Sequence, residues 1–273
     1  MNILRLWKDK MTNPKLMEII EKVVDIYEQR DEVMEFGDFY ALITGVYGKK
    51  CRVLSEEEAA GHQMALAKAG VYAISEDETD RAVSYNHGLR LGRHMRFYVN
   101  AHDADSSVEI VKGLAPRIDD REYKIKLISQ DKAGYDCLDN VVLYVPLNDC
   151  LEFHAKLLQG LASEHPEHFD DETLFTARRI GRGISYATSV PLWRCAILGQ
   201  EFIQDRYQNK FSFNGLHALV LKRTFDAAID RMIEDLDELT ALYAQALKDA
   251  RFDPERIHLN SLNRDPLERL EIR

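Results

Sequence analysis

The sequence predicts an α+β fold, in which a mixed or antiparallel sheet is flanked by helices and preceded by a mainly helical N-terminal region. Two patterns predict it: apolar residues recur with helical spacing over residues 14–70, and several segments between 71 and 145 alternate with the period of strands. Strands interleaved with helices are typical of this class. No internal repeat or change in composition divides the chain, so we expect one domain over 1–273, with 1–70 as its helical region.

Three helices are expected in this N-terminal region. Apolar positions over 14–34 keep helical spacing, and the proline at its first position suits a first turn. The same spacing continues over 36–48 and stops at a glycine. Ser55 and Glu58 have the spacing of a capping box, which predicts a third helix that ends near residue 69.

Strands and short loops are expected from residue 71 onward, with helices between and after them. The expected strands are 71–75, 81–84, 93–100 and the segments around Lys126 and Tyr144. The expected helices are 105–118, 147–163, 192–208 and a long one over 214–250. The stretch 165–192 is rich in loop residues.

Composition limits the classes of function. The chain has 273 residues, of which 45% are hydrophobic and 30% charged, and its formal net charge is −10. General binding to nucleic acid or to an anionic membrane surface is not expected, because both depend on a broad positive surface. The sequence has neither a long apolar span nor the apolar core of a signal peptide, so we expect a cytoplasmic protein.

Cysteines and histidines give no strong sign of a metal site or of disulfides. Cys51, Cys137, Cys150 and Cys195 are widely spaced and form no C-x-x-C pair, which predicts reduced, structural thiols. The segment His165–His168 contains two histidines, but its proline and the surrounding acidic residues favour a solvated loop. We therefore predict neither a bound metal nor an organic cofactor.

One strand face is unusually polar for an element that must pack. Side chains two apart share a face of a strand. One face of the strand 93–100 therefore carries His94, Arg96, Tyr98 and Asn100. In a neighbouring strand Lys124 and Lys126 occupy the row opposite Tyr123, Ile125 and Leu127. Cations at successive positions of one face indicate an anion or open solvent.

A loop with three arginines is the second informative feature. Arg178, Arg179 and Arg182 lie within five residues, together with two glycines that let backbone amides approach a ligand. Arginine forks match phosphate or carboxylate bidentately. Arginines on an acidic protein also pair with its own carboxylates, so both interpretations stay open. The glycine spacing lacks the strand-to-helix context of a dinucleotide site.

Several segments, taken in chain order, carry a family resemblance. They are Arg96–Asn100, the Lys126 strand, Tyr135–Pro146, Phe175–Thr176 with the glycine-rich loop, Trp193–Cys195 and Phe252–Asn260. Their order resembles the Hop A type III effector family, which is itself similar to the OspF and SpvC phosphothreonine lyases. The resemblance covers roughly 90–262, which would be the lyase-like core, and it is loose over 1–85.

The resemblance implies a phosphothreonine or phosphoserine lyase that eliminates phosphate and leaves dehydrobutyrine or dehydroalanine. Such enzymes act in lanthipeptide and other ribosomal peptide pathways, after a kinase-like partner has phosphorylated the precursor peptide. By this resemblance Lys126 is the base, and Arg96 and Arg194 hold phosphate. Tyr144 positions either the phosphate or the carbonyl group through its hydroxyl. Neighbouring cations such as Lys124 would lower the pKa of the base.

The sequence also departs from the family pattern. Tyr98 stands where the lyases have the histidine that protonates the leaving oxygen, so the general acid is Tyr98, His94 or no residue at all. Cys137 falls where a phosphate-binding arginine is expected, and the arginines of 178–182 would compensate for it. Trp193 replaces a histidine of many members.

Two other classes of function stay open. The first alternative to the lyase is a non-catalytic module that binds a phosphopeptide or leader peptide. The second is an effector that binds a host protein. An effector needs a secretion signal in a disordered N-terminus, whereas this chain is expected to be ordered almost from its start. Neither nucleic acid nor a membrane is expected as a partner.

Overall fold

A computed structural model describes most of the chain. The described residues are 14–29, 33–45, 47, 55–71, 75–77, 82–87, 94–118, 122–127, 137–147, 151–188, 194–203, 213–260, 265, 267 and 268. For a few of these, Arg194 and Cys195 among them, only the backbone is described. The predicted order at the N-terminus therefore lies, for residues 1–13, outside the described part.

The chain groups into two compact units, and one domain over 1–273 stays a prediction. Unit 1 contains residues 1–40 and 190–263, and unit 2 contains residues 41–189 and 264–273. The composition is uniform, and the grouping arises because the C-terminal helices pack against the first helix, a long-range pairing that no local pattern reveals. The boundary falls within helix α3 (Phe36–Thr44).

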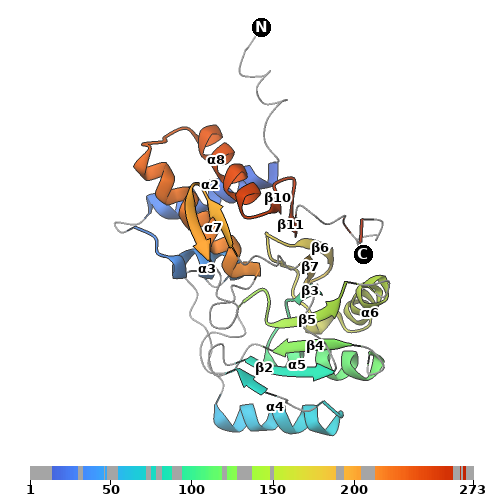
Figure 1. Ribbon diagram of the computed structural model, residues 1–273. Coiled ribbons are helices and arrows are strands. Elements are labelled where there is room, and N and C mark those ends of the chain that lie inside the picture. The colour runs from blue at the N-terminus through green and yellow to red at the C-terminus, as the bar shows by residue number, and fades with distance from the viewer. Residues whose placement is uncertain are drawn as a thin grey trace. The chain divides into compact units, whose positions relative to one another are not determined.

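Unit 2 is built on a seven-stranded sheet with every neighbouring pair antiparallel (Figure 1). Its spatial order is β1-β2-β4-β5-β3-β7-β6. The strands are β1 (Ser75–Asp77), β2 (Ala82–His87), β3 (His94–Val99), β4 (Tyr123–Leu127), β5 (Val141–Pro146), β6 (Arg178–Gly181) and β7 (Ile184–Thr188). The prediction of an α+β fold with an antiparallel sheet and flanking helices is confirmed.

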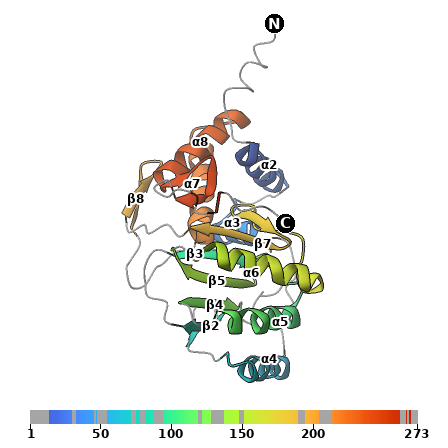
Figure 2. The ribbon, with the colours of Figure 1, turned by 90° about the vertical axis from the view of Figure 1, so that its right-hand side faces the viewer.

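Helices cover one face of this sheet. They are α4 (Glu56–Lys68), α5 (Ala104–Leu114) and α6 (Leu151–Glu164), with the short 3₁₀ helices η1 (Ala115–Arg117) and η3 (Pro166–His168). Figure 2 shows α5 and α6 in front of the strands. The predicted capping box of Ser55 and Glu58 opens α4. Asp103 caps α5 by accepting a hydrogen bond from the Ser106 amide.

The core of unit 2 lies between these helices and the sheet. Its members alternate along each strand, as in Met95, Phe97 and Val99 of β3, and they are almost inaccessible to water. Val111 and Leu158 complete the core from α5 and α6. The apolar halves of the predicted strand patterns are therefore the buried halves, and the polar halves lie on the opposite face.

Unit 1 is mainly helical. Its helices α2 (Pro14–Glu28), α7 (Phe213–Asp230) and α8 (Leu236–Asp249) accompany two strand pairs, β8 (Arg194–Ile197) with β9 (Gln200–Ile203) and β10 (Phe252–Asp253) with β11 (Arg256–Asn260). Phe225 of α7 packs on Tyr27 and Phe39, with ring centres 5.6 and 5.8 Å apart. Aromatic contacts of this kind hold the N-terminal and C-terminal helices together.

Two predictions for the C-terminal half are wrong. The helix expected over 192–208 is, in the described residues 194–203, the hairpin β8–β9. Leu198 and Gly199 form its two-residue turn with positive φ angles of 50° and 79°. This turn matches the twist of paired strands. Four apolar residues in a row fit both a helix and a buried strand, so the pattern could not separate them.

The long helix expected over 214–250 is two helices. The chain leaves α7 at Met232, where φ is 53°, and starts again at Asp235, whose carboxylate accepts from the Glu238 amide at 2.8 Å. Asp235 and Glu238 have the spacing of an N-cap and its third residue, a signal present in the sequence. Apolar periodicity on both sides masked it.

Most other elements lie close to their predicted positions, whereas the strand expected over 71–75 falls mainly on residues outside the described part. The helices α2 and α3 end at Glu28 and Thr44, a few residues before the predicted ends. The loop-rich stretch 165–192 contains η3 and the hairpin β6–β7. Cys137 is buried and forms no disulfide within the described residues. Within the described residues, no helix is long and apolar enough to cross a membrane.

Candidate functional site

Strand register brings three predicted site residues into one row across the sheet. Arg96 of β3 pairs with Tyr144 of β5, and Tyr144 pairs with Lys124 of β4. Directly opposed residues of an antiparallel sheet point to the same face. The three side chains therefore lie on one face of the sheet, opposite the face that carries the buried core residues.

Tyr144 lies at the centre of this row. The guanidinium carbon of Arg96 lies 5.3 Å from the centre of the Tyr144 ring, and the Lys124 ammonium lies 5.7 Å from it. Both distances allow attraction between a cation and the ring face. The ring of His94 is 5.4 Å away. Two cations, an imidazole and a phenol thus converge, and all four side chains are half-buried.

The next row holds the proposed base and one proposed acid. Tyr98 pairs with Val142, and Val142 pairs with Lys126, so the phenol and the amine flank a buried valine. Neighbouring strands are about 4.8 Å apart, which separates the two backbones by roughly 10 Å. Lys126 is half-buried, and it follows Lys124 on the same face.

Tyr98 is a protonated phenol in the folded protein. Burial raises its pKa, because a phenolate would lose its hydration, while the positive charge of Arg96 acts in the opposite direction. The charge of Asp139 raises the pKa further. A neutral Tyr98 can donate a hydrogen bond to an oxygen anion, but it is a weak acid for full proton transfer.

Asn100 and Asn140 fix the end of this face. Asn140 donates to the carbonyl oxygen of Ala101 and accepts from its amide, both at 2.8 Å. This pair of hydrogen bonds ties the turn before β5 to the end of β3. It thereby holds β5 in the register that places Tyr144 opposite Arg96. Asn100 donates to the Glu172 carbonyl at 3.2 Å, so its side chain holds a loop.

Arg178 does not join Arg96. It lies opposite Tyr186, on the helix-covered side of the sheet, and donates to Asp265 at 2.6 Å and to the Tyr186 hydroxyl at 3.2 Å. Tyr186 also donates to Asp265, at 2.6 Å. Asp265 is almost fully buried, and a buried carboxylate needs a partner of opposite charge. Arg178 supplies that charge, so it neutralises a carboxylate of its own chain.

Arg179 and Arg182 also bind groups of their own unit. Their distances to the Asp171 carboxylate are 3.5 and 3.8 Å, and Arg182 donates to the Phe169 carbonyl at 2.9 Å. Gly183, with φ of 61°, lies so close to the Asp170 and Asn100 carbonyls that a Cβ would overlap them. The glycine thus serves chain packing, and the interpretation of the cluster as partners of acidic residues fits all three arginines.

Arg194 belongs to the other unit. Its backbone lies in β8, and its side chain is outside the described part. Trp193 is outside the described residues altogether. The structure thus brings together Arg96, Lys124, Tyr144, His94, Tyr98 and Lys126, while the arginines of 178–182 are paired elsewhere.

Two polar residues of this face were missed from the sequence. Ser185 of β7 pairs with Tyr98 and is buried, and its hydroxyl has no hydrogen-bond partner among the described residues. Asp139 is buried next to Tyr98. The alternation of Ile184 and Tyr186 around Ser185 was a signal for a strand, but the loop composition of 165–192 concealed it.

Comparisons with known proteins agree with this fold. The model of the HopA1 effector protein family matches residues 63–259. Two solved structures are similar, both effector proteins of Pseudomonas syringae. The one from pathovar tomato strain DC3000 has a TM-score of 0.60 and 16% identity, covering 91% of this chain and 99% of that one.

The second solved structure, from pathovar syringae strain 61, has a TM-score of 0.55 and 14% identity, covering 90% of this chain and 96% of that one. At these identities the likeness concerns the fold alone. Among curated proteins, none matches the chain. The family model spans more than half of the sequence and includes the sheet, α5, α6 and α7. The chain therefore belongs to the HopA1 effector protein family.

Proposed function

We propose that this protein is a phosphothreonine or phosphoserine lyase that acts on a phosphorylated precursor peptide. The observation that carries the proposal is the row of Arg96, Tyr144 and Lys124, with Lys126 next along the same face. Fixed cations can bind the phosphate dianion, and a lysine next to other cations can lose its proton near neutral pH.

In the proposed reaction the neutral Lys126 amine takes the α-proton of the phosphorylated residue. The electron pair forms the Cα–Cβ double bond, the Cβ–O bond breaks, and phosphate leaves. Arg96 and Lys124 balance the charge that develops on phosphate. Tyr144, held between these cations, orients the phosphate through its hydroxyl. No metal or redox group takes part in these steps.

The proton for the leaving oxygen comes from Tyr98 or from His94, or no acid is needed. Tyr98 is buried and protonated, and it suits hydrogen bonding better than proton transfer because its pKa is raised. The ring of His94 lies 5.4 Å from that of Tyr144, and histidine is the residue type that most often acts as a general acid. Charge neutralisation by Arg96 and Lys124 would make an acid unnecessary. A kinase-like partner would supply the phosphorylated peptide, as in lanthipeptide pathways.

The decisive experiment is mass spectrometry of phosphothreonine and phosphoserine peptides incubated with the wild type and with Lys126→Ala. The wild type should remove phosphoric acid from the peptide, and the variant should not. Lys156→Ala is the matched control, since Lys156 is an exposed lysine of α6 that pairs with Glu152 at 2.6 Å. Its activity should equal that of the wild type.

Other results would change the assignment. Loss of HPO₃ alone would indicate a phosphatase. Binding of the phosphopeptides without reaction, by the wild type and by Lys126→Ala alike, would indicate a non-catalytic phosphopeptide or leader-peptide module. Full activity of Lys126→Ala would exclude this lysine as the base.

The second candidate is an effector that binds a host protein. The family name and the two Pseudomonas syringae structures favour it. The two candidates separate in a simple way, because a lyase needs the row around Tyr144 whereas surface binding does not. If Arg96→Ala leaves every measured activity intact, the effector interpretation gains and the lyase loses.

A further inference from the structure

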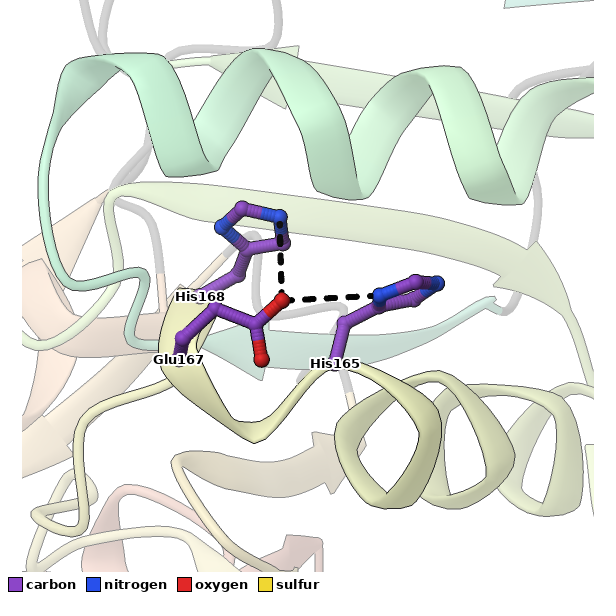
Figure 3. Close-up of side chains that lie close together, drawn as sticks. All are labelled: His165, Glu167 and His168. Carbon is purple, nitrogen blue, oxygen red and sulfur yellow. Dashed lines mark ion pairs between the residues drawn. The ribbon is translucent and has the colours of Figure 1, made fainter.

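Three side chains at the end of α6 bring metal-ligating atoms together. The Glu167 carboxylate oxygen Oε1 lies 3.6 Å from Nδ1 of His165 and 3.8 Å from Nε2 of His168 (Figure 3). All three ligand atoms lie within 4.8 Å of one another. Sequence spacing alone had favoured a solvated loop for this segment, and the side-chain geometry adds what spacing could not show.

The two distances from Glu167 to the histidines are close to those between neighbouring ligands of a tetrahedral metal site. Zinc binds imidazole nitrogen and carboxylate oxygen at about 2.0–2.2 Å, which places neighbouring ligand atoms roughly 3.3–3.5 Å apart. The two distances to Glu167 exceed this by a few tenths of an ångström. Small rotations of exposed side chains would close the difference, because His165 and Glu167 are more than half exposed.

A partly buried chain of hydrogen bonds supports the His168 ring on the side away from Glu167. Its Nδ1 lies 3.3 Å from the hydroxyl of Ser106, and this hydroxyl in turn bonds the carboxylate of Asp103. With the Ser106 proton committed to Asp103, Nδ1 of His168 carries a proton and donates it to Ser106. The lone pair is then on Nε2, which faces Glu167, as in the carboxylate-supported histidines of metal sites.

The backbone that carries these ligands is held at several points. The amide of His165 bonds Leu161 of α6 at 2.9 Å, and the amide of His168 bonds the His165 carbonyl at 3.1 Å. The His168 carbonyl accepts from the amide of His102 at 3.0 Å. Pro166 restricts the turn between the two histidines. The backbone of residues 165–168 is thus held in place by hydrogen bonds and by Pro166.

The surroundings offer space and no excess of positive charge. A hollow of about 260 Å³ is lined by both histidines and by Lys112 and Arg117. Lys112 pairs with Glu109 at 2.7 Å, and Arg117 pairs with Glu164 at 3.3 Å. Each lining cation is therefore balanced by a carboxylate, which reduces the repulsion that a metal cation would meet.

We propose that His165, Glu167 and His168 bind a divalent transition-metal ion of the zinc type. Two imidazoles and one carboxylate are ligands that zinc accepts, and they leave a coordination position for water or for a group held in the hollow. The proposal is independent of the lyase reaction, since it uses none of the residues around Tyr144.

Calorimetric titration of the purified, tag-free chain with Zn²⁺, after treatment with a chelator, tests the proposal. One ion should bind per chain with saturation. His165→Ala and His168→Ala should each lower the affinity at least about tenfold, and Ser106→Ala, which removes only the outer support, should lower it roughly tenfold. His102→Ala is the matched control, because His102 pairs with Asp170 at 2.9 Å and is no ligand. Its affinity should not change.

Either of two results would overturn the proposal. The first is the absence of stoichiometric binding by the wild type. The second is undiminished binding by a variant that combines His165→Ala with His168→Ala. Circular dichroism checks that the variants fold, and loss of fold is not expected because His165 is exposed. As a second readout, Co²⁺ substitution should give d–d absorption bands in the wild type and not in the double variant.

Discussion

The two faces of the seven-stranded sheet differ in burial and in charge. On the helix-covered face Phe97, Leu143 and Ile125 form a fully buried row. One residue away on each strand, Arg96, Tyr144 and Lys124 form a half-buried row with two cations. Residues next to each other in sequence therefore differ in what they contribute, because one packs in the core and the other presents a polar group. Substitutions at neighbouring positions can measure the two contributions separately.

The largest expected effect is on the helix-covered face. Phe97→Ala should lower the free energy of unfolding by about 4 kcal/mol, because it opens a cavity beside Tyr186 in the core. Arg96→Ala, its neighbour in sequence, should lower it by less than about 1 kcal/mol while weakening phosphopeptide binding. Urea denaturation followed by circular dichroism measures both. Equal losses of stability would end the distinction between the faces.

The second effect is the loss of stability when the buried ion pair of Arg178 and Asp265 is broken. Asp265→Ala should cost about 3 kcal/mol, since it leaves Arg178 and the buried hydroxyl of Tyr186 without their common partner. Tyr186→Phe, which keeps the ion pair, should cost about 1 kcal/mol. If thermal and urea denaturation give the two variants the same stability, Asp265 is not the centre of this network.

The third effect is a pH dependence of the free energy of unfolding, and it arises from His217 in unit 1. Burial lowers the pKa of His217 to about 3, between the rings of Phe252 and Phe213. The unfolded chain binds a proton near pH 6.5 and the folded chain does not, so stability is complete above that pH and falls on acidification. The loss should be about 1 kcal/mol between pH 6.5 and 5.5, and roughly 2 kcal/mol by pH 4.5.

His217→Gln tests this expectation, because glutamine does not titrate and can keep the donor to the Ile257 carbonyl. Denaturation curves of the variant between pH 7 and about 4.5 should lack this part of the acid dependence. An unchanged slope would show that His217 is not the group responsible.

The fourth effect should have opposite signs for stability and for binding. Ser185→Ala removes a buried hydroxyl that has no partner in the described part of the chain, so the free energy of unfolding should rise by about 1 kcal/mol. Phosphopeptide affinity, measured by fluorescence anisotropy, should fall between about twofold and tenfold if this hydroxyl serves the ligand. A loss of stability would mean that Ser185 is a packing residue.

The smallest expected effect is at the surface. Arg179→Ala should change the free energy of unfolding by less than about 0.5 kcal/mol, because its contact with Asp171 is long and exposed. Phosphopeptide binding should not change either. A large loss of binding on this substitution would return the arginines of 178–182 to the phosphate site.

Much of the fold could be predicted from local patterns, and the exceptions have physical reasons. Period-two alternation gave the correct faces of β3 and β4, because each has one apolar and one polar row. Alternation fails where both faces are buried, as in β7, which read as a loop although each of its residues is buried. The hairpin β8–β9 was missed because its turn uses Leu198 at positive φ, a conformation that no propensity favours for leucine.

The candidate site was predictable in part for the same reason. The row of Arg96, Tyr144 and Lys124 follows from strand faces once the strands are paired, and pairing needs only their order and polarity. The partners of Arg178 and the burial of Ser185 depend on Asp265 and on β7, which are distant in sequence or hidden by composition. Such contacts arise from tertiary packing, to which a single sequence gives no direct access.

The side chain of Asn140 has a consequence for folding. Its amide copies a backbone peptide group, since it both donates to and accepts from Ala101. A shift of β5 by one residue against β3 would turn Tyr144 toward the core and Leu143 toward the opposite face. A shifted register would break both hydrogen bonds between Asn140 and Ala101. The Asn140 side chain therefore disfavours that mispairing during folding. Asn140→Ala would then yield chains that are collapsed and helical yet wrongly assembled.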